Sequence, residues 1–151
     1  MCVKGTAVYT TPPETTLAEA VRDMVEHKVG ALLVCQRDVT EGERLVGIIT
    51  ERDLLRCFAS GKCGFASDAC GLAHITVAEV MTTELFTAKP SDLVVDWMGV
   101  MTNRRIRHVP VLVEGRLVGM VSIGDLMKAQ HDLLAVENRY MRDYIQGDKG
   151  G

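Results

Sequence analysis

Residues 47–54 read Gly-Ile-Ile-Thr-Glu-Arg-Asp-Leu, and residues 119–126 read Gly-Met-Val-Ser-Ile-Gly-Asp-Leu. This second copy lies 72 residues after the first. Upstream of it the two halves of the chain match at a larger offset of 77 residues, for example at Val34 and Val111. The first copy therefore contains about five extra residues, which fall in the polar stretch 37–44, where a hairpin loop tolerates insertion at little entropic cost. An internal repeat of this kind decides the architecture.

Length and composition agree with two small units that share one core. The chain has 151 residues, of which 47% are hydrophobic and 25% charged, as in ordinary soluble globular proteins. A single copy of roughly fifty residues buries too little surface to be stable alone, so we expect the copies to pack face to face. The net charge of −3 favours neither nucleic acid nor a membrane surface as a partner. The chain has neither a membrane-spanning apolar run nor a secretory signal pattern, so we expect it to be soluble.

Local patterns predict strand, helix, strand, strand and helix in each copy. In the first copy, Thr15 or Thr16 caps a helix from residue 17, and the apolar runs 31–35 and 45–49 are typical of buried strands. A helix over residues 53–59 follows. The second copy repeats this order at residues 85–87, 93–103, 109–113, 117–121 and from 123 onward. We divide the chain into a first repeat (8–58), a linker (59–75), a second repeat (76–129) and a C-terminal helix (130–147).

The five cysteines form an odd set without a framework spacing, which indicates a reducing compartment rather than disulfides. One stretch contains several metal-competent side chains, namely Cys57, Cys63, Cys70 and His74. Their spacing lacks the short ligand pairs of structural zinc sites, so we expect no metal site there. The stretch 59–73 is rich in Gly, Ser and Ala and is typical of a flexible linker.

The repeated element Gly-h-h-[Ser/Thr]-x-x-Asp (h, apolar) resembles the CBS domain, and two tandem copies resemble the CBS pair known as a Bateman module. The resemblance covers nearly all of residues 8–129. It includes Arg-Ile-Arg-His-Val-Pro-Val at residues 105–111, which is similar to the basic segment before a strand in nucleotide-binding members. The chain looks close to a stand-alone group with bacterial members and a plant mitochondrial member. The resemblance implies an α/β (α+β) fold in which the two repeats form one pseudo-two-fold module.

Two explanations compete for the polar residues of the repeated element. Thr50 and Asp53 are nearly a capping box, in which the hydroxyl and the carboxylate satisfy backbone amides at a helix start. Ser122 and Asp125 allow the same arrangement. Capping does not explain Arg52 or the basic residues at the start of a buried strand. A carboxylate with a hydroxyl also matches a ribose diol, and guanidiniums near a helix N-terminus match phosphate, which together describe a nucleotide site.

The resemblance implies ribose contacts for the two Asp residues, ribose or phosphate contacts for Thr50 and Ser122, and phosphate contacts for Arg52, Arg107 and His108. It places adenine in an apolar slot lined by the chain before each first helix (8–11 and 85–87) and by the starts of the inner strands. The predicted ligand-binding residues are Thr11, Gly30, Ala31, Thr50, Arg52, Asp53, Thr87, Arg105, Arg107, His108, Val109, Ser122 and Asp125. The two sites are unequal, because Gly30-Ala31 stands where the second copy has Arg107-His108, and Gly124 stands where the first has Arg52.

These observations predict a regulatory module without catalysis that binds AMP, ADP, ATP or a related adenosyl ligand such as NAD or S-adenosylmethionine. No nucleophile, metal set or phosphate-cradling Gly-rich loop accompanies Glu51 and Asp53, so we do not expect an enzyme. The alternative is a redox- or metal-responsive interaction scaffold that uses the linker cysteines. Apolar positions on several sides of the repeated helices predict a homodimer, with an unknown protein target. We expect a cytoplasmic location, with the mitochondrial matrix as the alternative.

Overall fold

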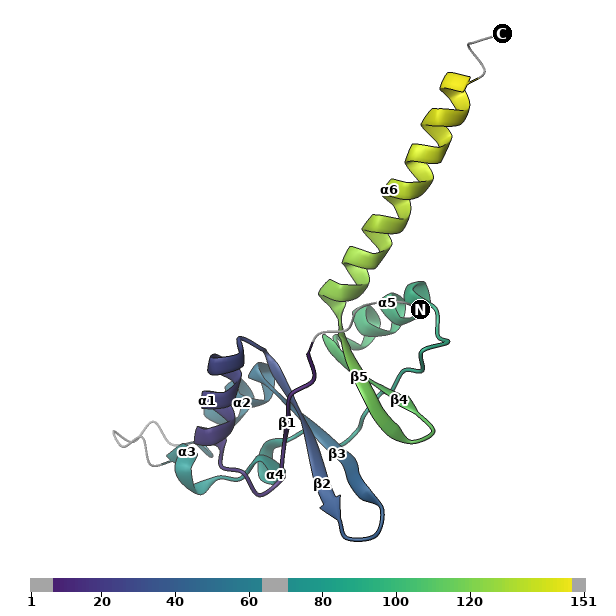
Figure 1. Cartoon of the computed structure of the whole chain (residues 1–151). Helices are drawn as coiled ribbons and strands as arrows, with labels where there is room; N and C mark the ends of the chain where they lie inside the picture. Colours follow the sequence, from purple (N-terminus) through teal and green to yellow (C-terminus); the bar gives the residue numbers. More distant parts are fainter. Residues whose placement is uncertain (1–6, 64–70, 148–151) are drawn as a thin grey trace.

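The structure is a computed structural model that describes residues 7–63 and 71–147 (Figure 1). Its first half comprises β1 (Thr10–Thr11), α1 (Leu17–His27), β2 (Ala31–Asp38), β3 (Gly42–Thr50) and α2 (Glu51–Ala59). Two short helices follow, α3 (Gly71–His74) and α4 (Val77–Val80). The second half comprises α5 (Val94–Arg104), β4 (His108–Val113), β5 (Arg116–Ser122) and α6 (Ile123–Gly147). The mixed α/β architecture with two repeats is confirmed.

The duplication extends to the pairing of individual residues. In the first half, Thr11 of β1 pairs in parallel with Val34 of β2; at the equivalent positions of the second half, Ala88 pairs in parallel with Val111. The antiparallel hairpins β2–β3 and β4–β5 both shift their register directly after Val34 and Val111, respectively. A β-bulge is a specific local feature. Its recurrence at the same position shows that the two repeats share their irregularities as well as their regular elements.

The five extra residues lengthen the first hairpin, as predicted. Its ladder continues to the pair Asp38 and Gly42, whereas the second hairpin ends at Val113 and Arg116. Residues 114 and 115 form the short turn of the second hairpin, with φ of 49° and 78°. The strands β2 and β3 are longer than the apolar runs 31–35 and 45–49 because the polar insertion continues the hydrogen-bonded ladder.

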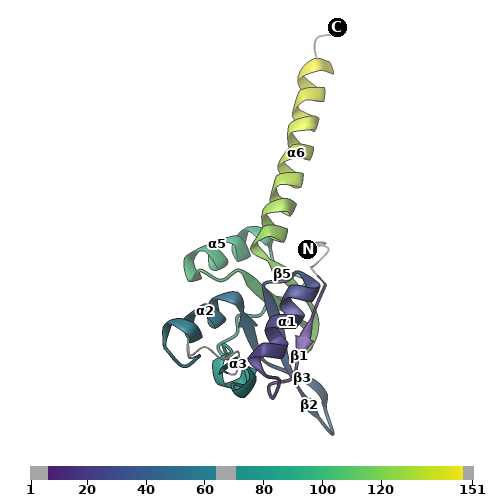
Figure 2. The ribbon, with the colours of Figure 1, turned by 90° about the vertical axis from the view of Figure 1, so that its left-hand side faces the viewer.

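Two elements differ from the prediction. Residues 85–87 do not form a strand, and in this segment only Ala88 forms a bridge, through its N–H to Pro110 and its carbonyl to Leu112. The helix predicted from residue 123 and the one predicted at 130–147 are a single helix, α6, of 25 residues. The reason is that no proline or glycine interrupts residues 125–146. The distal half of α6 projects away from the body of the molecule (Figures 1 and 2).

Three apolar clusters hold the repeats together. The first lies between α1, α2 and β2–β3, and the second lies between α5, α6 and β4–β5. A third cluster joins the two hairpins and contains Ala31, Leu33, Ile48 and Met120. Successive residues of a strand point to opposite faces, so β2 contributes Leu32 and Val34 to one cluster and Leu33 to another. This two-sided burial explains the continuous apolar run of β2 and confirms that the copies pack as one module.

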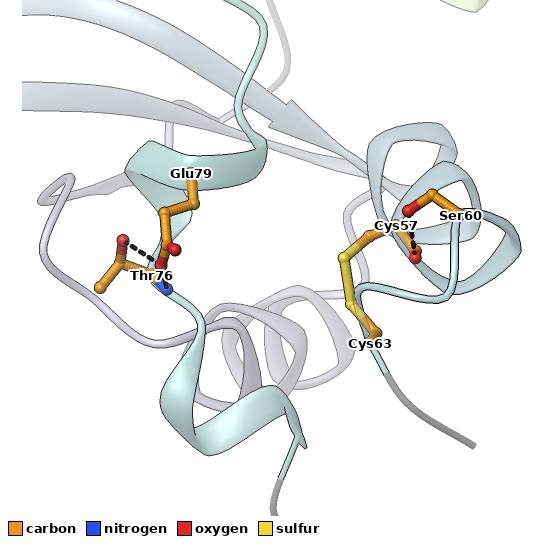
Figure 3. Close-up of a disulfide and its surroundings, with 5 residues drawn as sticks. All are labelled: Cys57, Ser60, Cys63, Thr76 and Glu79. Atoms are coloured by element: carbon orange, nitrogen blue, oxygen red, sulfur yellow. Dashed lines mark hydrogen bonds between the residues drawn. A yellow bond between two sulfur atoms is a disulfide. The ribbon is translucent and has the colours of Figure 1, made fainter. Parts of the chain in front are cut away.

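The chain after the linker completes the core of the first repeat. Val77 is fully buried in that core, and Ile75 packs against it. The N–H of Leu17 donates to the carbonyl of Ile75 (2.9 Å), and the N–H of Val77 donates to the carbonyl of Thr15 (2.8 Å). A capping box between Thr76 and Glu79 begins α4 (Figure 3). The described part of the expected flexible linker is therefore packed at its C-terminal end.

Cys57 and Cys63 form a disulfide, so the expectation of no disulfide is wrong for this pair (Figure 3). Helix α2 ends at Ala59, and Gly61 with φ of 74° turns the chain back, which leaves the two Cα atoms 5.7 Å apart. Both half-cystines are buried in the first core. Their sulfurs are thus not available to zinc, and the described residues contain no group of three metal-ligating side chains.

Two further findings concern the remaining cysteines and the membrane. Cys35 is a free, buried thiol whose pKa is raised by burial and, to a smaller extent, by Glu43. Cys2 and Cys70 lie outside the described residues. Over residues 7–63 and 71–147, no helix combines the length and apolar character needed to cross a membrane.

Candidate ligand-binding site

A pocket of about 760 Å³ lies between the repeats, at the start of α2. The last turn of α5 and the start of β4 form its other side, and Figure 2 shows α2 and α5 next to one another on one side of the hairpins. The lining comprises Gly30, Ile48, Thr50, Glu51, Arg52, Asp53, Arg56, Thr82, Glu84, Leu85, Phe86, Arg104, Arg105, Ile106, Arg107, His108 and Pro110. Residues of both repeats thus form one site.

A capping box fixes the carboxylate of Asp53 at the floor of this pocket. Its Oδ2 accepts from the backbone N–H and the hydroxyl of Thr50, both at 2.9 Å, and the N–H of Asp53 donates to Thr50 Oγ1 at 3.3 Å. The hydroxyl of Thr82 donates to Oδ1 at 3.0 Å. Asp53 is only 6% exposed. A carboxylate can accept about four hydrogen bonds, so this rigidly held group retains capacity for one more donor.

The second repeat contains the same box. Asp125 Oδ2 accepts from the N–H and the hydroxyl of Ser122, both at 2.8 Å, and the N–H of Asp125 donates back at 3.1 Å. The capping explanation is therefore confirmed for both copies. Since both boxes are alike, the difference between the two repeats comes from the residues around them.

Hydrogen bonds to backbone carbonyls hold the segments that carry the basic residues. Arg52 Nη1 donates to the carbonyl of Arg105 at 3.0 Å, which ties the first turn of α2 to the end of α5. The N–H of Ile123 donates to the carbonyl of Arg107 at 2.9 Å, and this bond is equivalent to the one from Glu51 to Gly30 at 3.0 Å in the first repeat. The two repeats thus have the same backbone hydrogen bond at this point. In the second repeat the accepting residue is Arg107, which has a guanidinium, and in the first it is Gly30, which has no side chain.

His108 is half-buried in the pocket wall, and its surroundings set its charge. Burial lowers the pKa of the imidazole below its ordinary value of 6.5, and Arg107 lowers this pKa further. Glu51 and Asp125 raise it, with a smaller effect than that of burial. His108 is therefore mainly neutral at pH 7, and an anion bound in the pocket would favour its protonation.

Seven of the thirteen predicted residues line the pocket: Gly30, Thr50, Arg52, Asp53, Arg105, Arg107 and His108. Three others, Thr11, Ala31 and Val109, are buried between strands and do not reach it. Thr87 is exposed and outside the lining, although its neighbours Leu85 and Phe86 belong to it. Ser122 and Asp125 occupy the equivalent position of the second repeat and do not belong to the lining, although Ser122 pairs with His108 across the β4–β5 ladder.

The prediction missed several lining residues, namely Ile48, Glu51, Arg56, Thr82, Glu84, Arg104, Ile106 and Pro110. Two of them carry a signal in the sequence. Arg56 follows Arg52 by four residues and so shares its helix face, and Arg104 directly precedes Arg105. Thr82 carries none, because it reaches the site by pairing with Ile48 of β3 across the linker.

Comparisons with known proteins agree on one family. The family model described as the CBS domain matches residues 5–60 and 77–132. A mitochondrial CBS domain-containing protein of Arabidopsis thaliana is 38% identical over 137 residues, which cover 89% of this chain and 62% of the plant protein. The chain thus spans less than two thirds of that relative's length.

Solved structures give the same result. A CBS-domain containing protein from Agrobacterium tumefaciens matches with a TM-score of 0.71 and 35% identity, over 84% of this chain and 87% of that chain. A CBS domain pair crystallised with 5′-methylthioadenosine and S-adenosyl-L-methionine matches with a TM-score of 0.68 and 24% identity, over 86% and 93% of the two chains. At this lower identity the likeness concerns the fold alone.

Proposed function

The chain belongs to the CBS-domain family, and we propose that it is a regulatory module that binds an adenosyl nucleotide in the pocket between its repeats. One observation carries this proposal. A single pocket contains the fixed carboxylate of Asp53, the hydroxyls of Thr50 and Thr82, and the basic side chains of Arg107 and His108. Carboxylate and hydroxyl groups recognise a ribose diol, and guanidiniums recognise phosphate.

The pocket lining also suggests how such a ligand would be divided among the residues. Asp53 would accept from a ribose hydroxyl, because Thr50 and Thr82 hold its carboxylate in place and leave it capacity for one more donor. The amides at the N-terminus of α2 and the guanidiniums would bind phosphate. Apolar side chains offer a surface for the base, namely Ile48, Leu85, Phe86, Ile106 and Pro110.

The test is ligand-induced stabilisation measured by thermal unfolding and calorimetry. The panel contains adenosine, AMP, ADP, ATP, NAD and S-adenosylmethionine, the last because a protein of the same fold was crystallised with it. A ligand at 100 times its dissociation constant should raise the free energy of unfolding by about 2.7 kcal/mol. If no adenosyl compound binds at millimolar concentration, the proposal is wrong.

We also propose that the module does not catalyse a reaction. The carboxylate of Asp53 is engaged in a capping box, and no cysteine or serine belongs to the lining of the described pocket. Mass spectrometry after prolonged incubation should recover the bound nucleotide unchanged. Conversion that scales with protein concentration would contradict this part of the proposal.

A homodimer is the proposed assembly, with a further protein target that is unknown. Leu55 on α2 and Met127 on α6 occupy equivalent positions of the repeats and are 68% and 58% exposed. Such paired apolar positions suit a two-fold interface between copies. Light scattering should give a dimer mass that Leu55→Glu reduces to a monomer mass; a monomer in the unmodified protein would refute the assembly.

We propose a cytoplasmic location, with the mitochondrial matrix as the alternative.

The disulfide favours a second candidate function, that of a redox-responsive interaction protein. Cys57 and Cys63 join the end of α2 to the start of the linker, next to the pocket residue Arg56. Under this alternative, reduction to two thiols would change partner binding while adenosyl ligands have no effect. Thiol labelling at a series of glutathione ratios, combined with a thermal shift panel in both redox states, separates the two functions.

A further inference from the structure

We infer that the pocket selects a nucleoside di- or triphosphate over a monophosphate, and that Arg56 and Arg104 are the residues that bind its outer phosphates. The inference rests on the proposed nucleotide-binding function and adds the ligand class to it. Neither residue belongs to the repeated motif, and the two come from different repeats. Their roles follow from the charges and from the placement of the pocket lining.

Guanidiniums outnumber carboxylates in the pocket lining. It contains five guanidiniums, from Arg52, Arg56, Arg104, Arg105 and Arg107. The carboxylates that face them come from Glu51, Asp53 and Glu84. The Asp53 carboxylate already accepts three hydrogen bonds from Thr50 and Thr82. The pocket therefore favours a polyanion, and guanidiniums bind phosphate oxygens in pairs of parallel hydrogen bonds.

Arg56 lies further along α2 than the residues expected to bind ribose. It follows Arg52 by four residues, which is about 6 Å along the axis of an α-helix on the same face. Arg52 is tied to the carbonyl of Arg105 at the start of α2. Arg56 is exposed and can therefore contact an anion one helical turn away from the Thr50–Asp53 box.

Arg104 is held at the edge of the pocket by an aromatic ring. Its guanidinium carbon lies 5.3 Å from the centroid of the Phe86 ring, a cation–π distance. Phe86 is 39% exposed, and both residues also line a shallow depression over α5 of about 660 Å³. Because Arg104 and Phe86 belong to both hollows, they mark the boundary between them. A phosphate chain that leaves the pocket would pass this guanidinium.

The equivalent position in the other repeat provides a matched control for each residue. Lys128 on α6 is equivalent to Arg56, and His27 on α1 is equivalent to Arg104. His27 even stacks on Tyr9, the equivalent of Phe86, with ring centroids 4.1 Å apart. The duplication thus preserves a basic side chain at both places and an aromatic partner at the Arg104 position. Neither Lys128 nor His27 lines the described pocket.

The test compares adenosine, AMP, ADP and ATP by calorimetry with the unmodified protein and with Arg56→Gln, Arg104→Gln, Lys128→Gln and His27→Gln. We expect ATP to bind more tightly than AMP to the unmodified protein. Arg56→Gln and Arg104→Gln should each weaken ATP by about tenfold and AMP by less than about twofold, since each removes one charge-assisted contact. The two control variants should change neither. Phe86→Leu should weaken ATP by less than Arg104→Gln, because it removes only the ring that holds the guanidinium.

Several results would overturn the inference. ATP that binds no more tightly than AMP, or equal losses for AMP and ATP in the Arg56 and Arg104 variants, would leave the proposed function intact and remove the polyphosphate specificity. Losses of the same size in the Lys128 and His27 variants would show a general charge effect. Failure of every adenosyl compound to bind would remove both proposals. Circular dichroism melting of each variant checks that these exposed substitutions leave the fold unchanged.

Discussion

The two repeats have nearly the same backbone and different surroundings. Each first helix ends with a residue in the left-handed conformation, Lys28 in the first repeat and Arg105 in the second, both with φ of 55°. Each second helix starts with a capping box, and each hairpin has its bulge at the same place. The described pocket nevertheless lies beside the box of the first repeat. Local chemistry that repeats thus determines the fold, and residues that do not repeat determine where a ligand can bind.

The non-repeated residues come from two sources. Arg107 and His108 replace Gly30 and Ala31 at the start of an inner strand, which supplies the charge. The segment after the linker supplies Thr82, which approaches β3 and donates to Asp53. The first repeat therefore provides the carboxylate, and the second repeat provides most of the basic groups.

Removal of the carboxylate from each capping box is the strongest way to test this comparison. Asp53→Ala should weaken nucleotide binding by about a hundredfold or more, because it removes a fixed ribose acceptor. Asp125→Ala should weaken binding at this pocket by less than about threefold. Both variants should lose about 1–2 kcal/mol of unfolding free energy through the lost cap. Calorimetry and thermal melting measure the two effects; equal binding losses would show that capping alone explains both carboxylates.

The equivalent glycines of the two motifs provide a test of stability. A Cβ at Gly47 would lie 2.6 Å from Met81 Sδ and 3.1 Å from the carbonyl oxygen of Thr82, whereas none of the described residues comes within 4 Å of one at Gly119. Gly47→Ala should therefore cost about 1–3 kcal/mol of unfolding free energy, because Met81 and Thr82 must shift. Gly119→Ala should change it by less than about 0.5 kcal/mol. Urea unfolding measures both, and similar losses would contradict the close packing of residues 81 and 82 on β3.

The pH dependence of phosphate binding tests the basic side of the pocket. Burial holds the pKa of His108 below its ordinary value of 6.5, so the imidazole gains its charge only as the pH falls below that value. We expect the ratio of AMP affinities between the unmodified protein and His108→Gln to rise by up to about tenfold from pH 8 to pH 5.5. The protonation of the AMP phosphate affects both proteins equally, so its effect cancels in this ratio. Adenosine should show no such change, and a flat ratio for AMP would exclude phosphate contact by His108.

The same shift has the opposite consequence for the stability of the ligand-free protein. Since the folded pKa is lower than the unfolded one, the unfolded chain binds the proton first as the pH falls. The part of the unfolding free energy that depends on a neutral His108 is fully present above about pH 6.5. It decreases as the pH falls below this value. Thermal melting without ligand should show this loss, and His108→Gln should reduce it.

The smallest expected effect concerns the left-handed residues at the ends of α1 and α5. Lys28→Gly and Arg105→Gly should each raise the free energy of unfolding by about 0.5–1 kcal/mol, because glycine adopts positive φ without a Cβ penalty. Only Arg105→Gly should weaken nucleotide binding, since Arg105 lines the pocket and Lys28 does not. Thermal melting measures the stability of the two variants, and calorimetry measures their nucleotide affinity. A binding loss in Lys28→Gly would contradict the assignment.

The internal repeat made most of the fold predictable. The offsets of 77 upstream and 72 downstream predict that Val34 and Val111 are equivalent and predict the position of the insertion; in the structure Val34 pairs with Gly47, and Val111 pairs with Gly119. The continuity of α6 and the missing strand at 85–87 were not predicted, because apolar spacing does not distinguish one long helix from two, and short apolar runs do not establish a ladder.

The site was predictable only where its residues belong to the motif. Thr50, Asp53, Arg107 and His108 occupy recognisable positions of the repeat. Thr82 depends on a contact across the linker, and the Cys57–Cys63 bond depends on the turn after α2, so neither follows from local pattern. Ser122 and Asp125 show that a motif residue can be placed correctly in the fold and still lie outside the described pocket.

The packing of residues 75–82 against the first repeat has a consequence for biosynthesis. During translation, the first family match is complete at residue 60, yet Val77 is still needed to fill the core of that unit. The N-terminal half must therefore wait on the ribosome until about twenty further residues have emerged before its interior can close. Residues 75–82 therefore determine when the first repeat can fold during synthesis. The sequence unit that was duplicated in evolution thus differs from the unit that folds, which also includes this segment.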